Sequence, residues 1–393
     1  MKKVLFFIHD LGPGGAEKVL VNLVNNMDPE VFEITVMTLI GGGVNEQFLK
    51  PHIRYCSCFQ KLPRGHTHFL KLLSPERLHR RFIKEKYDIE VSYLEGPSAR
   101  IISGCPYEDT KLVSWIHVEQ HTKAVAAKSF RNFRESEQCY QRFHQTICVS
   151  EYVKQDYLSL YPGLKNVAVL YNTNETGQIL RKKDEKVADG VFTDACFRLC
   201  GVGKLMTNKR FDMLLRIHKR LLDQGYSLQT CLLGDGPKRS ELERFVRENR
   251  LEDSVTFLGY QTNPYQYVAN CDLFVCTSIS EGFSTAATEA LIVGTAVCTV
   301  EVSGMKEMLG ANNEYGIVTE SNEEENNSDY QICIKVRDGD EYYVDDCKEN
   351  WDILNNLNNE TSCFIYLKDS SEREDGILGI RVSEIVAFYL EEG

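Results

Sequence analysis

Two glutamates, Glu281 and Glu289, lie eight residues apart in the stretch TSISEGFSTAATEALIVG at residues 277–294. The apolar run just before this stretch predicts a buried strand, and a polar turn follows it. A helix is expected to begin near Ser284, a good N-cap residue, and to end at Gly294. Such a helix start presents free backbone N–H groups to an anion. Carboxylates only accept hydrogen bonds, so the two glutamates suit the hydroxyl groups of a sugar or ribose, although a solvated surface helix has the same spacing.

Three glycine turns could bring backbone close to the same ligand. Gly14 and Gly15 follow an expected strand at Val4–Ile8, without the GxGxxG spacing of a dinucleotide fingerprint. Gly203 follows an expected strand at 197–202, and Gly234 lies in the sequence LLGDGP. The alternative for Gly14 and Gly15 is a tight strand-to-helix turn. Lys204 and Lys209, beside the second turn, could hold a diphosphate without a metal ion, or they could be ordinary surface lysines.

Together these stretches resemble family 4 retaining glycosyltransferases of the capsular and exopolysaccharide type, which have the two-domain GT-B fold. Glu281 with Gly-Phe after it and Glu289 resemble the EX7E signature. The sequence GGAE resembles the GGxE loop, GDGP resembles the G-x-G-P loop, and GKLMTNKR resembles the family's GR…KR element. Lys204 stands where the family usually has arginine, which keeps the charge and loses the forked geometry.

The resemblance implies a nucleotide-diphosphate sugar as donor, most simply a UDP-sugar, and a lipid-linked or oligosaccharide acceptor. Lys204 and Lys209 would hold the diphosphate, Glu289 the ribose and Glu281 the transferred sugar. His117, after the expected strand KLVSWI, would contact the transferred sugar or the acceptor, with His121 as the competing candidate. The leaving phosphate would deprotonate the acceptor, so no protein nucleophile is required. No DxD-like metal motif is placed at a strand end, so no cofactor and no obligatory metal are expected. The remaining implied donor-binding residues are Gly14, Gly15, Gly203, Gly234, Gly282, Phe283, Ser284 and Thr285.

Strands alternating with helices predict two Rossmann-like domains whose parallel sheets face a cleft. We place an acceptor-side domain at 1–170 and a nucleotide-sugar domain at 171–320, with the boundary near Tyr171. Residues 321–393 are predicted to form an acidic linker and a small β-rich module, with a hairpin turn at Asp338-Gly339 and a final helix. This module could bind a protein partner.

Charge and composition limit the other partners. The 393 residues carry a net charge of −12, and from Glu320 onward 20 acidic residues stand against 6 basic ones, which leaves about +2 for residues 1–319. This balance disfavours nucleic-acid binding. The 14 cysteines form no CxxC pair, so a reduced, cytoplasmic protein is expected. No apolar run is long enough to span a bilayer.

The sequence leaves alternatives open for membrane contact and for the type of activity. The basic, partly apolar segment 61–86 suits docking on an anionic membrane at the inner face of the cell, and a solvated helical face is the alternative. For activity, the alternatives are a catalytically silent partner subunit and a sugar-nucleotide epimerase. The altered tail and Lys204 favour the silent subunit, and product analysis without acceptor separates the epimerase from a transferase.

Overall fold

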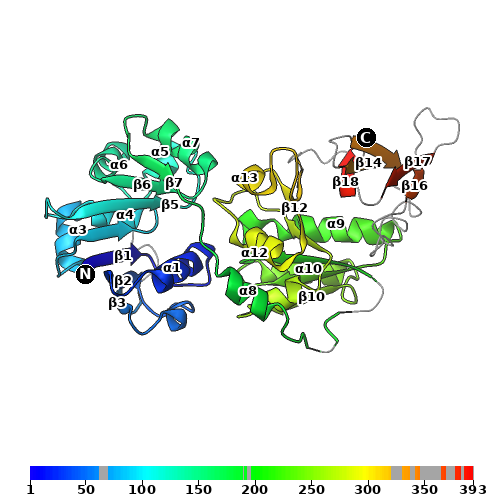
Figure 1. The fold of residues 1–393 in the computed structure, drawn as a ribbon, viewed down its shortest axis with the longest axis horizontal. Helices are drawn as coiled ribbons and strands as arrows, with labels where there is room; N and C mark the ends of the chain where they lie inside the picture. The colour runs from blue at the N-terminus through cyan, green and yellow to red at the C-terminus, as the bar shows by residue number, and fades with distance from the viewer. Residues whose placement is uncertain are drawn as a thin grey trace. The chain divides into compact units, whose positions relative to one another are not determined.

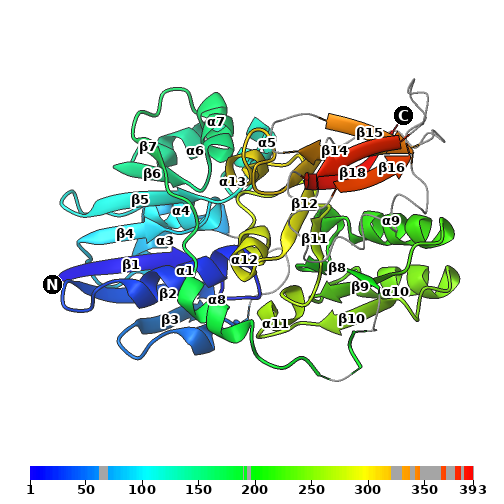
Figure 2. The ribbon, with the colours of Figure 1, turned by 45° about the vertical axis from the view of Figure 1, so that its right-hand side comes forward.

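Two units, each built around one parallel β-sheet, make up the chain in the computed structural model (Figures 1 and 2). The first unit comprises Met1–Glu175 and the short segment Ser280–Thr285, and the second comprises Thr176–Ile279 and Ala286–Gly393. The structure describes residues 1–61, 70–188, 190–192 and 196–319, and beyond them only the backbone of five strands. The predicted pair of parallel-sheet α/β domains is confirmed.

The sheet of the first unit has the strand order β3-β2-β1-β4-β5-β6-β7. Its strands are β1 (Lys2–Ile8), β2 (Phe32–Ile40), β3 (Arg54–Phe59), β4 (Ile89–Ser92), β5 (Lys111–Ile116), β6 (Gln145–Cys148) and β7 (Val167–Val169). Its helices are α1 (Gly15–Asn26), α3 (Pro75–Phe82), α4 (Pro97–Ile102), α5 (Lys123–Ala126), α6 (Phe133–Tyr140) and α7 (Glu151–Leu160), with a 3-10 turn at Glu46–Phe48.

Alternation along β1 shows why helices cover both faces of this sheet. Val4 and Phe6 pack in one cluster with Leu20 of α1, whereas Leu5 and Phe7 pack in another cluster that includes residues of α4. Successive strand residues point to opposite faces, so a strand that is apolar at every position needs cover on both sides. Parallel pairing of neighbouring strands requires helical crossovers, which supply that cover.

The sheet of the second unit has the order β10-β9-β8-β11-β12-β13. Its strands are β8 (Phe197–Val202), β9 (Leu228–Leu233), β10 (Val255–Gly259), β11 (Leu273–Cys276), β12 (Ala296–Val300) and β13 (Ile317–Thr319). The helices are α8 (Thr176–Lys182), α9 (Phe211–Asp223), α10 (Arg239–Glu248), α11 (Tyr265–Val268), α12 (Thr285–Val293) and α13 (Met305–Leu309), with a 3-10 turn at Thr207–Lys209.

Each sheet has one place where the strand order reverses, between β1 and β4 in the first unit and between β8 and β11 in the second. Loops that follow the two central strands run in opposite directions there. Sheets of this type bind ligands beyond the carboxyl ends of those strands. The loops after β1, β8 and β11 carry most of the candidate residues.

The C-terminal strands form two antiparallel sheets. Strand β14 (Tyr330–Val336) pairs with β15 (Glu341–Asp345) and β18 (Ile385–Glu392), and β16 (Phe364–Lys368) pairs with β17 (Ile377–Arg381). The pairing of Lys335 with Glu341 is that of a hairpin, and the predicted turn at Asp338-Gly339 lies outside the described residues. The prediction of a final helix is wrong. The β-branched and aromatic residues of that segment form strand β18, which pairs with β14.

Candidate functional site

The loops after β8 and β11 are tied together where the strand order of the second unit reverses. The Thr277 hydroxyl donates to the carbonyl oxygens of Lys209 (2.9 Å) and Arg210 (2.8 Å). Farther along the loop, the Ile279 amide donates to the Asn208 carbonyl at 2.9 Å. These bonds fix the backbone from which the Lys209 side chain extends.

Lys204 differs from its neighbours in this loop. Its side chain is exposed and forms no ion pair with any residue in the described part of the chain. Arg210, by contrast, lies 3.4 Å from Asp212. A lysine without a carboxylate partner keeps its charge available to an anionic ligand.

The backbones of Gly203 and Gly234 are in close contact just after the ends of β8 and β9. A Cβ atom on Gly234 would lie 1.9 Å from the Gly203 carbonyl oxygen, and Gly234 has a φ of +137°. The amide of Gly203 donates to the carbonyl oxygen of Leu233, and the amide of Gly234 donates to the carbonyl oxygen of Gly259. The pair thus allows two neighbouring strand ends to approach more closely than residues with side chains could.

Helix α12 buries one of the two glutamates. It runs from Thr285 to Val293, directly after the predicted N-cap residue Ser284, and is followed by Gly294 with a φ of +94°. Glu289 is 8% exposed and accepts a hydrogen bond from the Tyr265 hydroxyl at 3.3 Å. A carboxylate held in this way has a defined orientation and retains acceptor capacity for further hydroxyl groups.

The loop that carries Glu281 belongs to the first unit. A Cβ atom on Gly282 would lie 1.5 Å from the carbonyl oxygen of His117, so the two backbones are in direct contact. Phe283 packs against Tyr171, with ring centroids 5.1 Å apart, and its carbonyl accepts from Asn172 at 3.2 Å. Half-buried Glu281 therefore lies in a loop that is anchored beside His117.

The glycine loop after β1 meets the same segment. A Cβ atom on Gly15 would lie 2.9 Å from the Thr285 hydroxyl, so Gly15 and Thr285 are neighbours. Gly14 is the N-cap residue of α1, and the Glu17 carboxylate folds back over it. Glu17 thus occupies the position from which an acidic side chain caps its own helix start.

His117 is a buried, neutral imidazole. It is 6% exposed, and burial lowers its pKa to about 3, while a hydrogen bond to the backbone of Tyr93 acts in the opposite direction. Its Nε2 atom has no hydrogen-bond partner among the described residues. A ring nitrogen of a neutral imidazole in this position can form a hydrogen bond with a hydroxyl group of a ligand.

Neighbouring groups fix the His117 ring and separate it from His121. The Tyr93 ring lies 4.9 Å from the His117 ring between centroids, and the His117 amide donates to the Glu95 carboxylate at 3.0 Å. Burial raises the pKa of Glu95. His121 is exposed and lies 3.5 Å from Asp156. Of the two histidines, His117 has the environment of a site residue.

The candidate residues therefore form one group in each unit. The group in the first unit brings together His117, Gly14, Gly15, Glu281, Gly282, Phe283, Ser284 and Thr285. In the second unit, Gly203, Lys204, Lys209 and Gly234 lie near the ends of β8 and β9, and Glu289 lies in α12. The first offers neutral and acidic acceptors for hydroxyl groups, and the second offers cations and a buried carboxylate.

Two tyrosines that contact the candidate residues were not identified from the sequence. Tyr265 orients Glu289 from 24 residues away, and Tyr93 holds His117 through its ring and backbone. No spacing motif connects either tyrosine to its partner, because both contacts depend on how α11 and β4 lie in the folded sheets.

Comparison with known proteins covers both units. The family model described as Glycosyltransferase Family 4 matches residues 13–176, and the model described as Glycosyl transferases group 1 matches residues 183–332. A relative from Campylobacter jejuni is 27% identical over 335 residues, which is 82% of this chain and 87% of the relative. That protein is an N-acetylgalactosamine-N,N'-diacetylbacillosaminyl-diphospho-undecaprenol 4-alpha-N-acetylgalactosaminyltransferase.

Two further proteins extend the comparison. The lipopolysaccharide core biosynthesis glycosyltransferase LpsD of Rhizobium meliloti is 24% identical over 70% of this chain and 71% of its own length. The crystal structure of Anabaena Alr3699/HepE in complex with UDP superposes with a TM-score of 0.64 at 19% identity. It covers 82% of this chain and 86% of that chain, which shows the shared fold.

Proposed function

Because this chain belongs to the family 4 glycosyltransferases of GT-B fold, we propose that it transfers a sugar from UDP to a lipid-linked acceptor with retention of configuration. The observation that carries the proposal is the loop after β8, where Lys204 and Lys209 follow a central strand at the edge that binds ligands in such sheets. Glu289 lies buried in α12, the helix that follows the neighbouring central strand β11. The acceptor class is supported by the Campylobacter jejuni relative, whose name specifies a diphospho-undecaprenol acceptor.

In the proposed donor complex, Lys204 and Lys209 neutralise the diphosphate in place of a metal ion. Glu289, oriented by Tyr265, accepts hydrogen bonds from the ribose diol. The backbone N–H groups at the start of α12 add a second contact for the diphosphate. Charge stabilisation of the leaving diphosphate lowers the barrier most when these groups are already positioned, as the backbone bonds around Lys209 provide.

For the transfer step, we assign Glu281 and His117 to the sugar hydroxyls. The bond between the anomeric carbon and the diphosphate oxygen breaks, and the acceptor oxygen forms the new bond on the same face of the sugar. The departing diphosphate oxygen takes the proton of the acceptor hydroxyl, so the mechanism requires no protein nucleophile. Neutral His117 forms a hydrogen bond with a hydroxyl group at Nε2.

The test is a transfer assay with radiolabelled UDP-sugars and an undecaprenyl-diphosphate-linked acceptor in the presence of EDTA. We expect transfer with one UDP-sugar, an α-linked product from an α-linked donor, and a loss of roughly 100-fold in kcat for Glu281→Gln. Glu252→Gln, which changes an exposed glutamate of the second unit, is the matched control. Turnover of Glu281→Gln within threefold of wild type contradicts the assigned role.

The same assay separates the other activities. If the protein converts the UDP-sugar to its epimer when no acceptor is present, the activity is that of an epimerase and not of a transferase. Nucleotide binding without turnover on any acceptor would identify a silent subunit, and an inverted anomer would exclude retention.

We also propose that the first unit docks on an anionic membrane through the turn at Leu70–Leu73. Leu72 is 74% exposed at the tip of this turn. Among the described residues no helix has the length and apolar character to cross a bilayer. The part of the predicted basic segment at residues 62–69 lies outside the described residues.

Two arginines hold the backbone of this turn. Buried Arg100 donates to the carbonyl oxygens of Leu70 and Leu73, each at 2.8 Å, and Arg131 donates to those of Lys71 (2.8 Å) and Leu72 (3.1 Å). Glu135 neutralises Arg100 at 2.9 Å. An exposed leucine on a fixed backbone can enter an interface without the entropy cost of ordering a loop.

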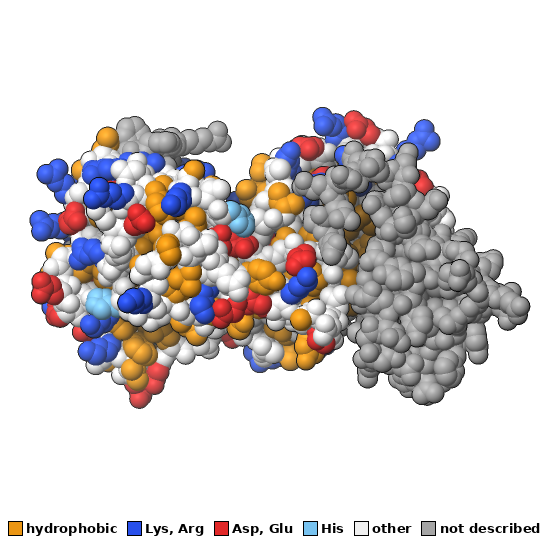
Figure 3. Space-filling view, turned by 90° about the horizontal axis from the view of Figure 1, so that it is seen from above, with side chains coloured by type: hydrophobic (Ala, Val, Ile, Leu, Met, Phe, Trp, Pro, Cys, Tyr) orange, Lys and Arg blue, Asp and Glu red, His pale blue; other side chains and the backbone are white. Residues whose placement is uncertain are grey.

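Positive charge surrounds the fixed turn. Figure 3 shows Lys and Arg side chains interspersed with hydrophobic ones on one face of the first unit. Exposed cations on α3, α5 and α6 and their flanks include Arg77, Arg80, Arg81, Lys123, Lys128, Arg131 and Arg134. Near an anionic surface each such cation contributes about 1 kcal/mol at physiological salt.

Sedimentation with vesicles of phosphatidylglycerol and phosphatidylcholine tests the docking. Leu72→Asp is expected to reduce vesicle binding about tenfold, because it removes the apolar anchor and adds an anion. Val31→Asp, at another exposed apolar residue of the first unit, is the control. Equal binding of Leu72→Asp and wild type, or no dependence on the anionic lipid, would contradict the proposal while leaving the transfer activity unaffected.

A further inference from the structure

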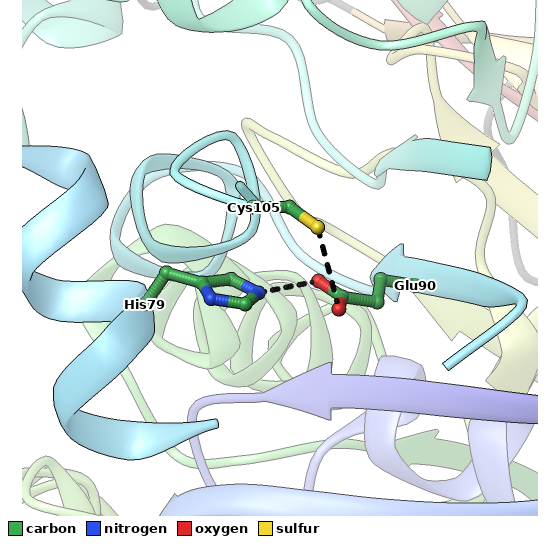
Figure 4. Close-up of side chains that lie close together, drawn as sticks. All are labelled: His79, Glu90 and Cys105. Carbon is green, nitrogen blue, oxygen red and sulfur yellow. Dashed lines mark hydrogen bonds and ion pairs between the residues drawn. The ribbon is translucent and has the colours of Figure 1, made fainter. Parts of the chain in front are cut away.

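Three side chains with metal-binding groups meet inside the first unit, from three separate elements (Figure 4). His79 comes from α3, Glu90 from β4, and Cys105 from the segment that follows α4. Their exposed fractions are 1%, 0% and 0%, and the potential ligand atoms all lie within 4.8 Å of one another. The cluster is thus closed off from solvent by the core of the unit.

The Glu90 carboxylate at the centre is incompletely satisfied. Its Oε2 atom lies 2.8 Å from His79 Nε2, and its Oε1 atom accepts from the Cys105 thiol at 3.6 Å. Among the described residues these are the hydrogen bonds of its carboxylate. A thiol is a weak donor, so a fully buried carboxylate, which offers about four acceptor positions, has only one strong hydrogen bond here. Buried carboxylates are costly unless they are paired more fully than this.

We propose that His79, Glu90 and Cys105 bind a divalent transition-metal ion of the Zn²⁺ type as a structural site. Imidazole nitrogen, carboxylate oxygen and thiolate sulfur are the ligand types that this ion takes. A neutral imidazole, a carboxylate and a thiolate around a doubly charged cation give a centre with no net charge. Such a centre removes the cost of the unsatisfied carboxylate in the apolar interior.

The distances fit such an ion after a small adjustment. Zinc bonds of about 2.0–2.3 Å in tetrahedral geometry place neighbouring ligand atoms roughly 3.3–3.7 Å apart. The separation between Cys105 Sγ and Glu90 Oε1, 3.6 Å, already has this length. His79 Nε2 lies 2.8 Å from the other carboxylate oxygen, Oε2. Binding through a single oxygen therefore requires the carboxylate to turn and the three ligand atoms, which all lie within 4.8 Å of one another, to draw together around the ion. A fourth position is left for a water molecule or another ligand.

The chemistry of Cys105 links ion binding to proton release. A metal ligand must be a thiolate, so binding releases the thiol proton of Cys105 to solvent. His79 binds as the neutral imidazole. The ion would connect α3 and the segment after α4 to the central strand β4.

The experiment measures Zn²⁺ and Co²⁺ binding to the full-length protein after dialysis against EDTA. Wild type is expected to bind one Zn²⁺ per chain, to unfold at a higher temperature with Zn²⁺, and to show a thiolate-to-cobalt absorption band with Co²⁺. Cys105→Ser should abolish the band and weaken Zn²⁺ binding at least tenfold. His79→Gln should weaken Zn²⁺ binding and keep the thiolate band at high Co²⁺.

Cys139→Ser is the matched control, because Cys139 is another buried thiol of the same unit that is not in the cluster. It should bind both ions as wild type does. Folded wild type that binds no Zn²⁺ and shows no cobalt band would overturn the proposal, and the three residues would then form only a hydrogen-bonded network. Loss of the band in Cys139→Ser and its survival in Cys105→Ser would overturn it equally.

Discussion

At the scale of single residues, the burial of His117 makes the unfolding free energy depend on the pH of the solution. Its pKa is about 3 in the folded chain and about 6.5 in an unfolded one. Below pH 6.5 the unfolded state therefore binds a proton that the folded state does not, so stability falls as pH falls from about 6.5 toward 3 and is constant above that window. At the pH of a working enzyme, His117 is a neutral hydrogen-bonding group.

Replacing His117 by glutamine should reduce this sensitivity to acid. Each pKa unit corresponds to 1.36 kcal/mol, so between pH 7 and pH 4 wild type is expected to lose roughly 3 kcal/mol more unfolding free energy than His117→Gln. Urea unfolding at the two pH values measures the difference. Exposed His52 supplies the control, since His52→Gln should follow wild type. Equal losses in His117→Gln and wild type would contradict the burial argument.

The sequence indicated residues whose chemistry is local and gave no sign of those whose chemistry depends on the fold. The predicted helix after Glu281 matches α12 closely, because capping residues and apolar spacing act over a few residues. The cluster of His79, Glu90 and Cys105 has no spacing motif, since its members come from different elements. The packing of α3 and α4 beside β4 brings them together.

At the scale of elements, close backbone contacts position the loops that carry the candidate residues. The contact between Gly282 and the His117 carbonyl joins the loop after β11 to the end of β5, and the contact between Gly203 and Gly234 joins the ends of β8 and β9. The glycines were visible in the sequence, but their partners were not. A glycine indicates that backbone passes close to something, and the topology decides what that is.

Gly282→Ala should therefore displace the loop that carries Glu281. The added Cβ would lie 1.5 Å from the His117 carbonyl oxygen, and backbone on both sides must move to relieve the overlap. We expect turnover to fall about 100-fold, as for a misplacement of about 1 Å, and the unfolding free energy to fall by roughly 1–3 kcal/mol. Transfer assays and urea unfolding measure the two effects.

Gly163→Ala is the control for this substitution. Gly163 lies in the first unit, and a Cβ there would have no atom within 4 Å, so both quantities should stay near wild type. If Gly282→Ala keeps wild-type turnover, the loop does not depend on the His117 contact for its position.

At the scale of the whole molecule, the two units have separate hydrophobic cores. Cys200, Leu233 and Ala290 belong to a cluster of the second unit alone, and Leu5, Phe130 and Tyr157 belong to one of the first. Units with their own cores can unfold separately. The donor diphosphate and ribose are assigned to the second unit, so a ligand that carries only these groups should stabilise that unit more than the other.

Hydrogen exchange with and without UDP measures this difference. A ligand at 100 times its dissociation constant adds about 2.7 kcal/mol to the stability of the state that binds it, which slows exchange through unfolding by about 100-fold. We expect this slowing in β8 and β9 and little change in β2 and β3. Glu289→Gln should remove most of the effect, and Glu252→Gln should keep it. A ligand protects the unit whose native state it binds. Equal slowing of exchange in both units would therefore mean that they unfold as one cooperative body. Slowing confined to β2 and β3 would place the nucleotide in the first unit.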